Sequence, residues 1–127
     1  MKKIISVDFD GTLSSYRSGW LGAHIASDPP TPGAMDFLRE ALAHFSVHIH
    51  SARSESEKGR KVMKDWLLQH YKSHHRLTTA QAVKELSAVQ WPLCKPHAHL
   101  SLDDRAVQFK GVWPSMQEIR DFKPWNR

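Results

Sequence analysis

Acidic residues directly follow two short apolar stretches of the sequence, residues 2–7 and 98–102. These acids are Asp8, Asp10, Asp103 and Asp104. A carboxylate can serve as a nucleophile, as a general acid or base, or as an oxygen ligand for a hard cation such as Mg²⁺. Ser51 follows a third apolar stretch and adds a hydroxyl donor. These residue types suit phosphate chemistry, in which the anionic oxygens must be neutralised before a carboxylate can attack.

Each of these polar side chains follows a predicted strand. Residues 2–7 are rich in β-branched side chains and predict a short buried strand. Residues 47–49 alternate apolar side chains with histidine and predict a strand just before Ser51, and residues 98–102 show a similar alternation. Because parallel strands bring their carboxyl ends to one edge of a sheet, we expect the acids and Ser51 to meet there.

Helix-start signals lie between and after the predicted strands. Thr31 as N-cap, with Pro32 at the first helical position, predicts a helix to about His44. The last predicted helix has Ile119 and Phe122 on one face. Three capping boxes predict the remaining helix starts: Ser54 with Glu57, Thr78 with Gln81, and Ser115 with Glu118. Strands that alternate with helices indicate an α/β fold whose central parallel sheet is covered on both faces.

Residues 13–31 contain several glycines and prolines and show no sustained period, which predicts a long irregular connection. This segment leaves from the first acidic pair, so we expect it beside the site. Its Tyr16, Arg17, Trp20 and His24 offer an aromatic and basic surface that suits a phosphorylated ligand. We expect a mobile flap, and the alternative is an ordered loop that seals one edge of the sheet.

Length and composition limit the class of protein. The chain of 127 residues has the size of one domain, spanning residues 1–127, and its 40% hydrophobic and 24% charged residues are typical of a soluble globular protein. The first apolar stretch ends at Asp8 and is too short for a signal core or a membrane span, so we expect a cytoplasmic protein with no membrane partner. The single cysteine, Cys94, agrees with a reducing compartment.

The excess of basic over acidic residues favours anionic partners. A net charge of +5 suits phosphate esters, nucleotides or nucleic acid. The basic residues are scattered, however, and a solvated surface is an equal alternative to nucleic-acid binding. Strand alternation, rather than metal binding, explains four of the histidines: His48, His50, His97 and His99.

The order of the motifs resembles the haloacid dehalogenase-like (HAD) superfamily, and the similarity extends over nearly the whole chain. Its first motif is a hydrophobic strand followed by Asp-x-Asp-x-Thr, and residues 8–12, Asp-Phe-Asp-Gly-Thr, match it completely. Its second motif is a strand that ends in Ser or Thr, which Ser51 matches. The tripeptide Ser-Ala-Arg at residues 51–53 is similar to that of small capless members.

The third and fourth motifs of that superfamily are also present. The third is a lysine, best matched by Lys95, although Lys84 is also available. The fourth is a hydrophobic strand that ends in paired acids, matched by Asp103 and Asp104. The resemblance implies a three-layer, Rossmann-like fold with a central parallel sheet and no large cap domain. It also implies that the protein is a phosphatase of the small capless type.

The resemblance also implies a reaction and a set of roles. Asp8 is expected to be the nucleophile, forming an aspartyl-phosphate, and Asp10 the general acid and base. Mg²⁺ is the expected cofactor, held by Asp8, Asp103 and the backbone carbonyl of Asp10, with Asp104 binding directly or through water.

Five further residues are expected to support the site. Ser51 donates a hydrogen bond to a phosphoryl oxygen, and Lys95 supplies a positive charge. Gly11 allows a tight backbone path after the strand, and the Thr12 hydroxyl orients the loop. Arg53 either contacts the substrate or forms a surface ion pair, and the sequence leaves both alternatives open.

The resemblance therefore implies a magnesium-dependent phosphomonoesterase with an open site. Its substrate would be a phosphorylated small molecule, a nucleotide or a nucleic-acid end. One alternative is a catalytically silent relative that binds a phosphorylated ligand. The other is a phospho-receiver-like signalling domain, but a receiver needs its phospho-acceptor Asp at the end of a middle strand, where this chain has Ser51.

Overall fold

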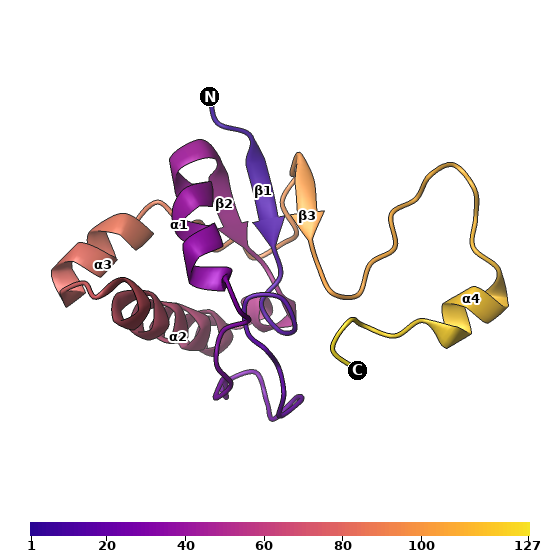
Figure 1. Ribbon diagram of the computed structural model, residues 1–127, viewed down its shortest axis with the longest axis horizontal. Coiled ribbons are helices and arrows are strands. Elements are labelled where there is room, and N and C mark those ends of the chain that lie inside the picture. Colours follow the sequence, from indigo (N-terminus) through magenta and orange to yellow (C-terminus); the bar gives the residue numbers. More distant parts are fainter.

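The computed structural model describes residues 1–127 and has an α/β fold built around a small parallel sheet. The strands are β1 (Ile4–Val7), β2 (Ser46–Ile49) and β3 (Leu100–Leu102), in the order β2-β1-β3 (Figure 1). Both neighbours pair with β1 in parallel. The predicted parallel α/β arrangement is confirmed, and the carboxyl end of β1 lies between the ends of two other strands.

The register of the sheet separates apolar from small polar side chains, because alternate residues of a strand point to opposite faces. One face carries only apolar residues along the three strands: Ile5, Val7, Val47, Ile49, Leu100 and Leu102. The opposite face carries Ser6 flanked by His48 and Ser101. The apolar side chains of β1 and β2 on the first face are buried, so the core forms over these two strands.

Four α-helices and one 3₁₀ turn complete the fold. They are α1 (Ala34–His44), η1 (Ala52–Glu55), α2 (Glu57–His75), α3 (Thr79–Leu86) and α4 (Met116–Asp121). Figure 1 shows α1, α2 and α3 gathered on the β2 side of the sheet. Helix α2 contributes Met63, Trp66, Leu67 and Tyr71 to the core, and α1 contributes Met35 and Leu38 among others. None of the helices has the length and apolar content needed to cross a membrane.

Helix α1 begins later than the sequence predicts. Its N-cap is Gly33, at a φ of 82°, and not Thr31. The Thr31 hydroxyl donates a hydrogen bond of 2.7 Å to the Thr12 carbonyl, so it is engaged with the loop after β1 and does not cap the helix. Pro32 therefore precedes α1, and Thr31 instead ties the start of this helix to the first motif.

The predicted capping box of Ser54 and Glu57 is wrong. The Ser54 hydroxyl accepts a hydrogen bond of 3.0 Å from the Ser51 backbone N–H, while the Ser51 hydroxyl caps the 3₁₀ turn η1. The N-cap of α2 is Ser56, whose hydroxyl accepts from the Gly59 N–H at 2.9 Å. The serines of this segment thus shape the end of β2 before α2 begins, whereas the predicted boxes of α3 and α4 form as expected.

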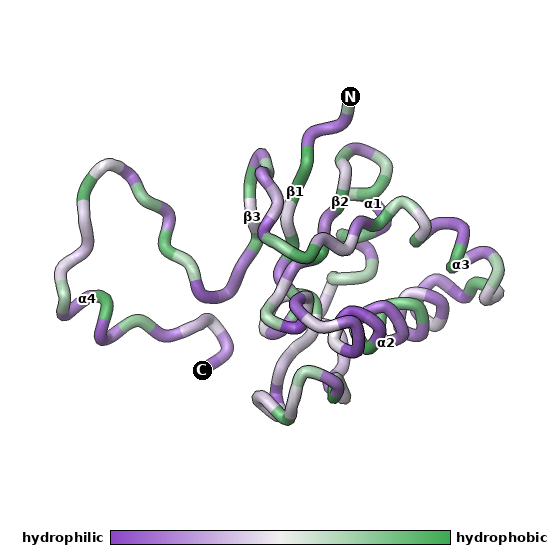
Figure 2. The backbone as a smooth tube through the Cα atoms, turned by 180° about the vertical axis from the view of Figure 1, so that it is seen from behind, coloured by the Kyte–Doolittle hydropathy of each residue, from purple (hydrophilic) through white to green (hydrophobic).

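Strand β3 and the segment after it are exposed. All three residues of β3 are exposed, and α4 buries none of its residues. Figure 2 shows hydrophobic and hydrophilic stretches alternating along this segment, which runs out from the sheet before the C-terminus returns. Ile119 and Phe122 are 53% and 39% exposed, so the predicted apolar face of the last helix has no cover. The expected helical cover of the sheet therefore does not reach β3.

Candidate active site

Three carboxylates converge at the carboxyl ends of β1 and β3. Asp8 directly follows β1, and its backbone N–H donates to the Leu102 carbonyl at 2.9 Å, which holds it beside the residues that end β3. Oxygens from Asp8, Asp103 and Asp104 lie within 4.8 Å of one another. The structure thus brings together acids that lie 95 positions apart in the sequence, from Asp8 to Asp103.

Burial and the neighbouring carboxylates raise the pKa of Asp8. Burial of its carboxyl group is the largest cause, followed by a hydrogen bond with Asp104 and by the negative charge of Asp103, and together they raise the pKa from 3.8 to about 8. The charged form of Asp8 is disfavoured because its carboxyl group is largely buried and lies beside two other carboxylates. A positive charge placed among the three carboxylates would reverse this preference.

The donor set fits a hard divalent cation. The three side chains offer only carboxylate oxygens, and no backbone N–H donates to the Asp10 carbonyl. Mg²⁺ is typically bound by one or two carboxylates together with substrate oxygens and waters. The residues present therefore fit Mg²⁺, with Asp8, Asp103 and the Asp10 carbonyl as the proposed ligands and Asp104 beside them.

A cavity of about 220 Å³ opens beside this cluster. Asp8, Asp103, Ser51 and Lys95 all line it, so four separate segments of the chain contribute to one space. Lys84 lies on α3 and is not one of the lining residues. The geometry therefore favours Lys95 over Lys84 as the positive charge of the site.

Ser51 is held in place by its own backbone turn. Its side chain is buried, and its oxygen accepts from the Arg53 N–H at 3.0 Å. The hydroxyl proton points to the sulfur of Met63 at 3.5 Å, and a thioether is only a weak acceptor. This proton is therefore available to a stronger acceptor in the cavity, such as a phosphoryl oxygen.

Gly11 and Thr12 form the turn that follows Asp10. Gly11 has a φ of 81°, and a side chain at this position would collide with the carboxylate of Asp104. Only glycine allows both the backbone conformation and the close approach. The Thr12 hydroxyl is buried and has no hydrogen-bond partner, so it does not orient the loop as predicted.

Arg53 is buried, with 2% of its surface exposed, and it pairs with Asp10. Its Nε donates to the two Asp10 carboxylate oxygens at 2.9 and 3.2 Å, and its Nη2 donates to one of them at 3.0 Å. Its Nη1 donates to the carbonyls of Gly22 and Ala23 at 3.0 and 2.8 Å. The predicted alternative of a surface ion pair is therefore wrong, and a substrate contact would require Arg53 to leave these partners.

Residues 13–31 lie beside the site and have an ordered stem. The Ser15 N–H donates to the Pro29 carbonyl at 2.8 Å, and the Thr31 N–H donates to the Leu13 carbonyl at 2.9 Å. Leu13 is 3% exposed and belongs to the hydrophobic core. The expectation of a mobile flap is therefore wrong for the stem, because its ends are paired like a short hairpin and Leu13 packs in the core.

Two aromatic rings that the sequence assigns to a ligand surface contact arginines of the chain instead. The Trp20 ring lies 4.9 Å from the Arg53 guanidinium, and the Tyr16 ring lies 5.1 Å from that of Arg127. Such cation–π contacts occupy one face of each ring. Trp20 is still 51% exposed, so its other face is open to solvent.

The C-terminus also contacts the loop of the candidate site, which the sequence did not indicate. Three consecutive side chains each donate a hydrogen bond to a backbone carbonyl after β1: Trp125 to Gly11 at 2.8 Å, Asn126 to Ser15 at 3.1 Å, and Arg127 to Tyr16 at 3.1 Å. Trp125 also lines a second hollow of about 430 Å³ together with Asp103 and Asp104. No local pattern could have shown this, because Trp125 and Gly11 are 114 positions apart.

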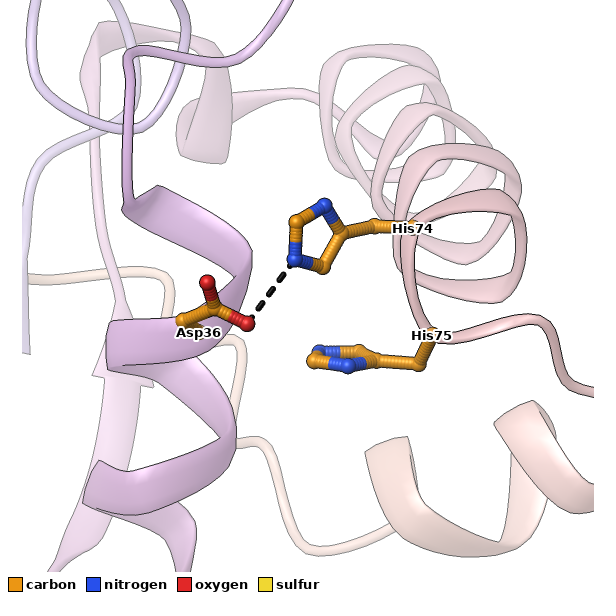
Figure 3. A group of neighbouring side chains, drawn as sticks. All are labelled: Asp36, His74 and His75. Atoms are coloured by element: carbon orange, nitrogen blue, oxygen red, sulfur yellow. Dashed lines mark hydrogen bonds and ion pairs between the residues drawn. The ribbon is translucent and has the colours of Figure 1, made fainter.

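A second group of metal-binding residue types lies between α1 and α2. Figure 3 shows Asp36 of α1 facing His74 and His75 at the end of α2. His74 Nε2 pairs with the Asp36 carboxylate at 2.8 Å. Both nitrogens of His75 have partners, the Met35 carbonyl at 3.1 Å and Arg39 at 3.3 Å. These contacts explain the group without a metal ion, and no residue of the predicted site belongs to it.

Comparison of the chain with protein-family models, with curated proteins and with solved structures finds no match. Support for a function therefore comes from the site itself. Its acids, Ser51 and Lys95 meet at the carboxyl end of a central parallel strand, which is where α/β folds bind ligands.

Proposed function

We propose that this protein is a magnesium-dependent phosphohydrolase in which Asp8 attacks the phosphorus atom of a phosphomonoester. The observation that carries the proposal is the cavity in which Asp8 and Asp103 face Ser51 and Lys95. The pKa of Asp8 is raised, so a cation is needed if all three carboxylates are to be charged together at neutral pH. A phosphate ester brings further negative charge. A bound Mg²⁺ would neutralise both sets of oxygens.

The chain supplies groups for a two-step displacement. An Asp8 oxygen forms a bond to phosphorus while the bond to the leaving oxygen breaks, and Asp10 gives that oxygen its proton. Water then attacks the phosphorus of the aspartyl-phosphate, Asp10 takes the proton of that water, and Asp8 is released with inorganic phosphate. Ser51 and Lys95 hold the phosphoryl oxygens during both steps.

We also propose that the fold is of the HAD type, without a large cap domain. The order of the motifs supports this, as does their meeting at one edge of the sheet. Residues 13–31 are too few for a folded domain, so the cavity would stay open to solvent. The substrate class we propose is a phosphomonoester on a small molecule, a nucleotide or a nucleic-acid end.

The test is hydrolysis of an aryl phosphate with and without Mg²⁺. We expect turnover that excess chelator abolishes and Mg²⁺ restores, because the carboxylates repel the substrate without a cation. Asp8→Asn should abolish both turnover and phosphorylation of the protein, whereas Asp10→Asn should slow turnover roughly 10²–10⁴-fold. A screen over nucleotides, sugar phosphates and phosphorylated nucleic-acid ends would then identify the substrate.

Asp65→Asn is the matched control, since Asp65 is an exposed acid that pairs with Lys61 on the surface of α2. It should hydrolyse the aryl phosphate at the wild-type rate. Undiminished turnover in chelator, or wild-type turnover by Asp8→Asn, would exclude the proposed mechanism. Tight binding of phosphate esters with no turnover would instead favour a silent phospho-ligand-binding protein.

A further inference from the structure

The guanidinium of Arg53 joins two segments that are far apart in the sequence. On one side it donates to both carboxylate oxygens of Asp10, and on the other it donates to the carbonyls of Gly22 and Ala23. Its flat surface lies 4.9 Å from the centre of the Trp20 ring. The loop of residues 16–26 and the Asp10 carboxylate therefore share one rigid, planar partner.

This arrangement keeps Asp10 away from the cavity that holds Asp8. Asp10 is not among the residues that line the cavity, and its side chain is 15% exposed. Both of its oxygens accept hydrogen bonds from Arg53. To act on a substrate in the cavity, the Asp10 side chain must therefore exchange Arg53 for a substrate oxygen.

The two sides of Arg53 cannot change independently. A guanidinium with 2% of its surface exposed has no water to replace a lost partner, and a buried charge without its partner is costly. If the loop carries Gly22 and Ala23 away, Arg53 keeps these two acceptors only by moving with the loop, and in doing so it leaves Asp10. If Asp10 turns away, Arg53 keeps only neutral carbonyls, and its hold on the loop weakens.

We propose that Arg53 is a positioning residue that couples the 16–26 loop to the orientation of the Asp10 side chain. In the structure Arg53 holds both the loop and the Asp10 carboxylate, and Asp10 does not line the cavity. Displacement of the loop releases Asp10 towards the reacting phosphate. This role of Asp10 rests on the proposed function, but the coupling between Arg53, Asp10 and the loop can be measured without any substrate.

The first experiment is hydrogen–deuterium exchange of the loop in wild type and in Asp10→Asn. The Ile25 N–H, which donates to the Gly22 carbonyl at 3.2 Å, reports on the loop segment that Arg53 holds. Asp10→Asn replaces a charge-assisted pair with a neutral one, so we expect exchange in residues 16–26 to be about tenfold faster or more. Exchange in α1 should be unchanged.

Glu85→Gln provides a matched control. Like Asp10, Glu85 accepts hydrogen bonds from an arginine through both of its carboxylate oxygens; the donor is Arg39, and both distances are 3.0 Å. Glu85 has no contact with the loop. It should leave exchange in residues 16–26 at the wild-type rate. Equal exchange in wild type and Asp10→Asn, or an equal increase in Glu85→Gln, would overturn the coupling whether or not the protein hydrolyses phosphate.

The second experiment separates positioning from substrate contact by kinetics on an aryl phosphate. Arg53→Lys keeps the charge but loses the planar fork, so we expect kcat to change about tenfold or more while KM stays within about threefold. A rise in KM with unchanged kcat would show that Arg53 contacts the substrate and would overturn its positioning role. If Arg53→Lys does not fold, exchange in Asp10→Asn decides the proposal alone.

The two proposals can fail separately. A protein that hydrolyses no phosphate ester with Mg²⁺, but whose loop loosens in Asp10→Asn, keeps the coupling and loses the proposed function. An active phosphohydrolase whose loop exchange does not respond to Asp10→Asn keeps its function and loses the coupling.

Discussion

Replacement of Asp8 by Asn should stabilise the metal-free protein at alkaline pH. Burial of Asp8 and the carboxylates beside it hold its pKa at about 8, against 3.8 for the unperturbed group. Asn has nearly the same shape and carries no charge, so it removes the electrostatic cost without leaving a cavity. A residue proposed as the nucleophile would thus reduce the stability of the chain that carries it.

The sign and size of this effect follow from linkage. Between pH 3.8 and about pH 8 the unfolded chain has released a proton that the folded chain keeps, so the free energy of unfolding falls as pH rises. The contribution of the Asp8 carboxyl group to the free energy of unfolding is fully present below pH 3.8 and is lost by about pH 8 to 9. The whole shift corresponds to roughly 6 kcal/mol. Because the cavity opens to solvent, which screens the charges, we expect on the order of 3 kcal/mol.

The assay is thermal and urea unfolding of wild type and Asp8→Asn from pH 4 to pH 9 in chelator. The two proteins should unfold alike near pH 4, and at pH 9 Asp8→Asn should melt roughly 10 °C higher. Saturating Mg²⁺ should reverse the order at pH 9, because a cation that binds the folded wild type stabilises it. Asp65→Asn should follow wild type at every pH.

A constant difference between wild type and Asp8→Asn across this pH range would refute the reasoning, since no proton would then be linked to folding at this site. A lower melting temperature for Asp8→Asn at pH 9 in chelator would refute it as well. If Mg²⁺ stabilises both proteins equally, Asp8 is not one of its ligands.

Three further substitutions test other contacts of the structure. Gly11→Ala should lower stability by about 1–3 kcal/mol and should also lower Mg²⁺ affinity, because the alanine side chain would meet Asp104 at a position with positive φ. A wild-type melting temperature would contradict this packing. Trp66→Ala should cost about 3–5 kcal/mol in urea unfolding, since its ring is buried against Phe9; a loss below about 1 kcal/mol would place the ring outside the core. Trp125→Phe removes the N–H that donates to Gly11 and should speed amide exchange in residues 11–16 severalfold; unchanged exchange would show that this hydrogen bond does not hold the loop.

The sequence predicted the strands and the meeting of the acids because both depend on local patterns. Alternation and β-branched residues mark β1 and β2, and acids directly after a strand must lie at its carboxyl end. Once the strands are parallel, Asp8 and Asp103 have little freedom to lie anywhere but at one edge. The position of the predicted site followed from topology, with no knowledge of side-chain contacts.

The helix starts show why capping signals can mislead. Thr31 and Ser54 both have the residue type of an N-cap, but the Thr31 hydroxyl is bonded to the loop after β1 and the Ser54 hydroxyl to the Ser51 N–H in the turn before α2. A hydroxyl can satisfy only a few groups, so a distant or a local partner competes with the helix end. The boxes that begin with Thr78 and Ser115 have no such competitor, and they formed as predicted.

The contacts of Arg53 and Trp125 could not be predicted from the sequence. Arg53 lies 43 positions from Asp10, and neither spacing nor composition indicates which arginine becomes buried. The sequence showed only that Arg53 follows Ser51 closely, which left its role open.

The short, uncovered strand β3 separates the folding of this protein from the assembly of its site. β3 has three residues, pairs only with β1 and contributes nothing to the buried core, so its local opening leaves the core intact. Asp103 and Asp104 directly follow this strand, and their repulsion from Asp8 favours opening. Closing the long chain segment between β1 and β3 also makes this pairing a late step in folding. The chain can therefore be native in its core while the edge that carries the proposed site is still unformed, and the fraction of molecules with an assembled site is set by a second, weaker equilibrium.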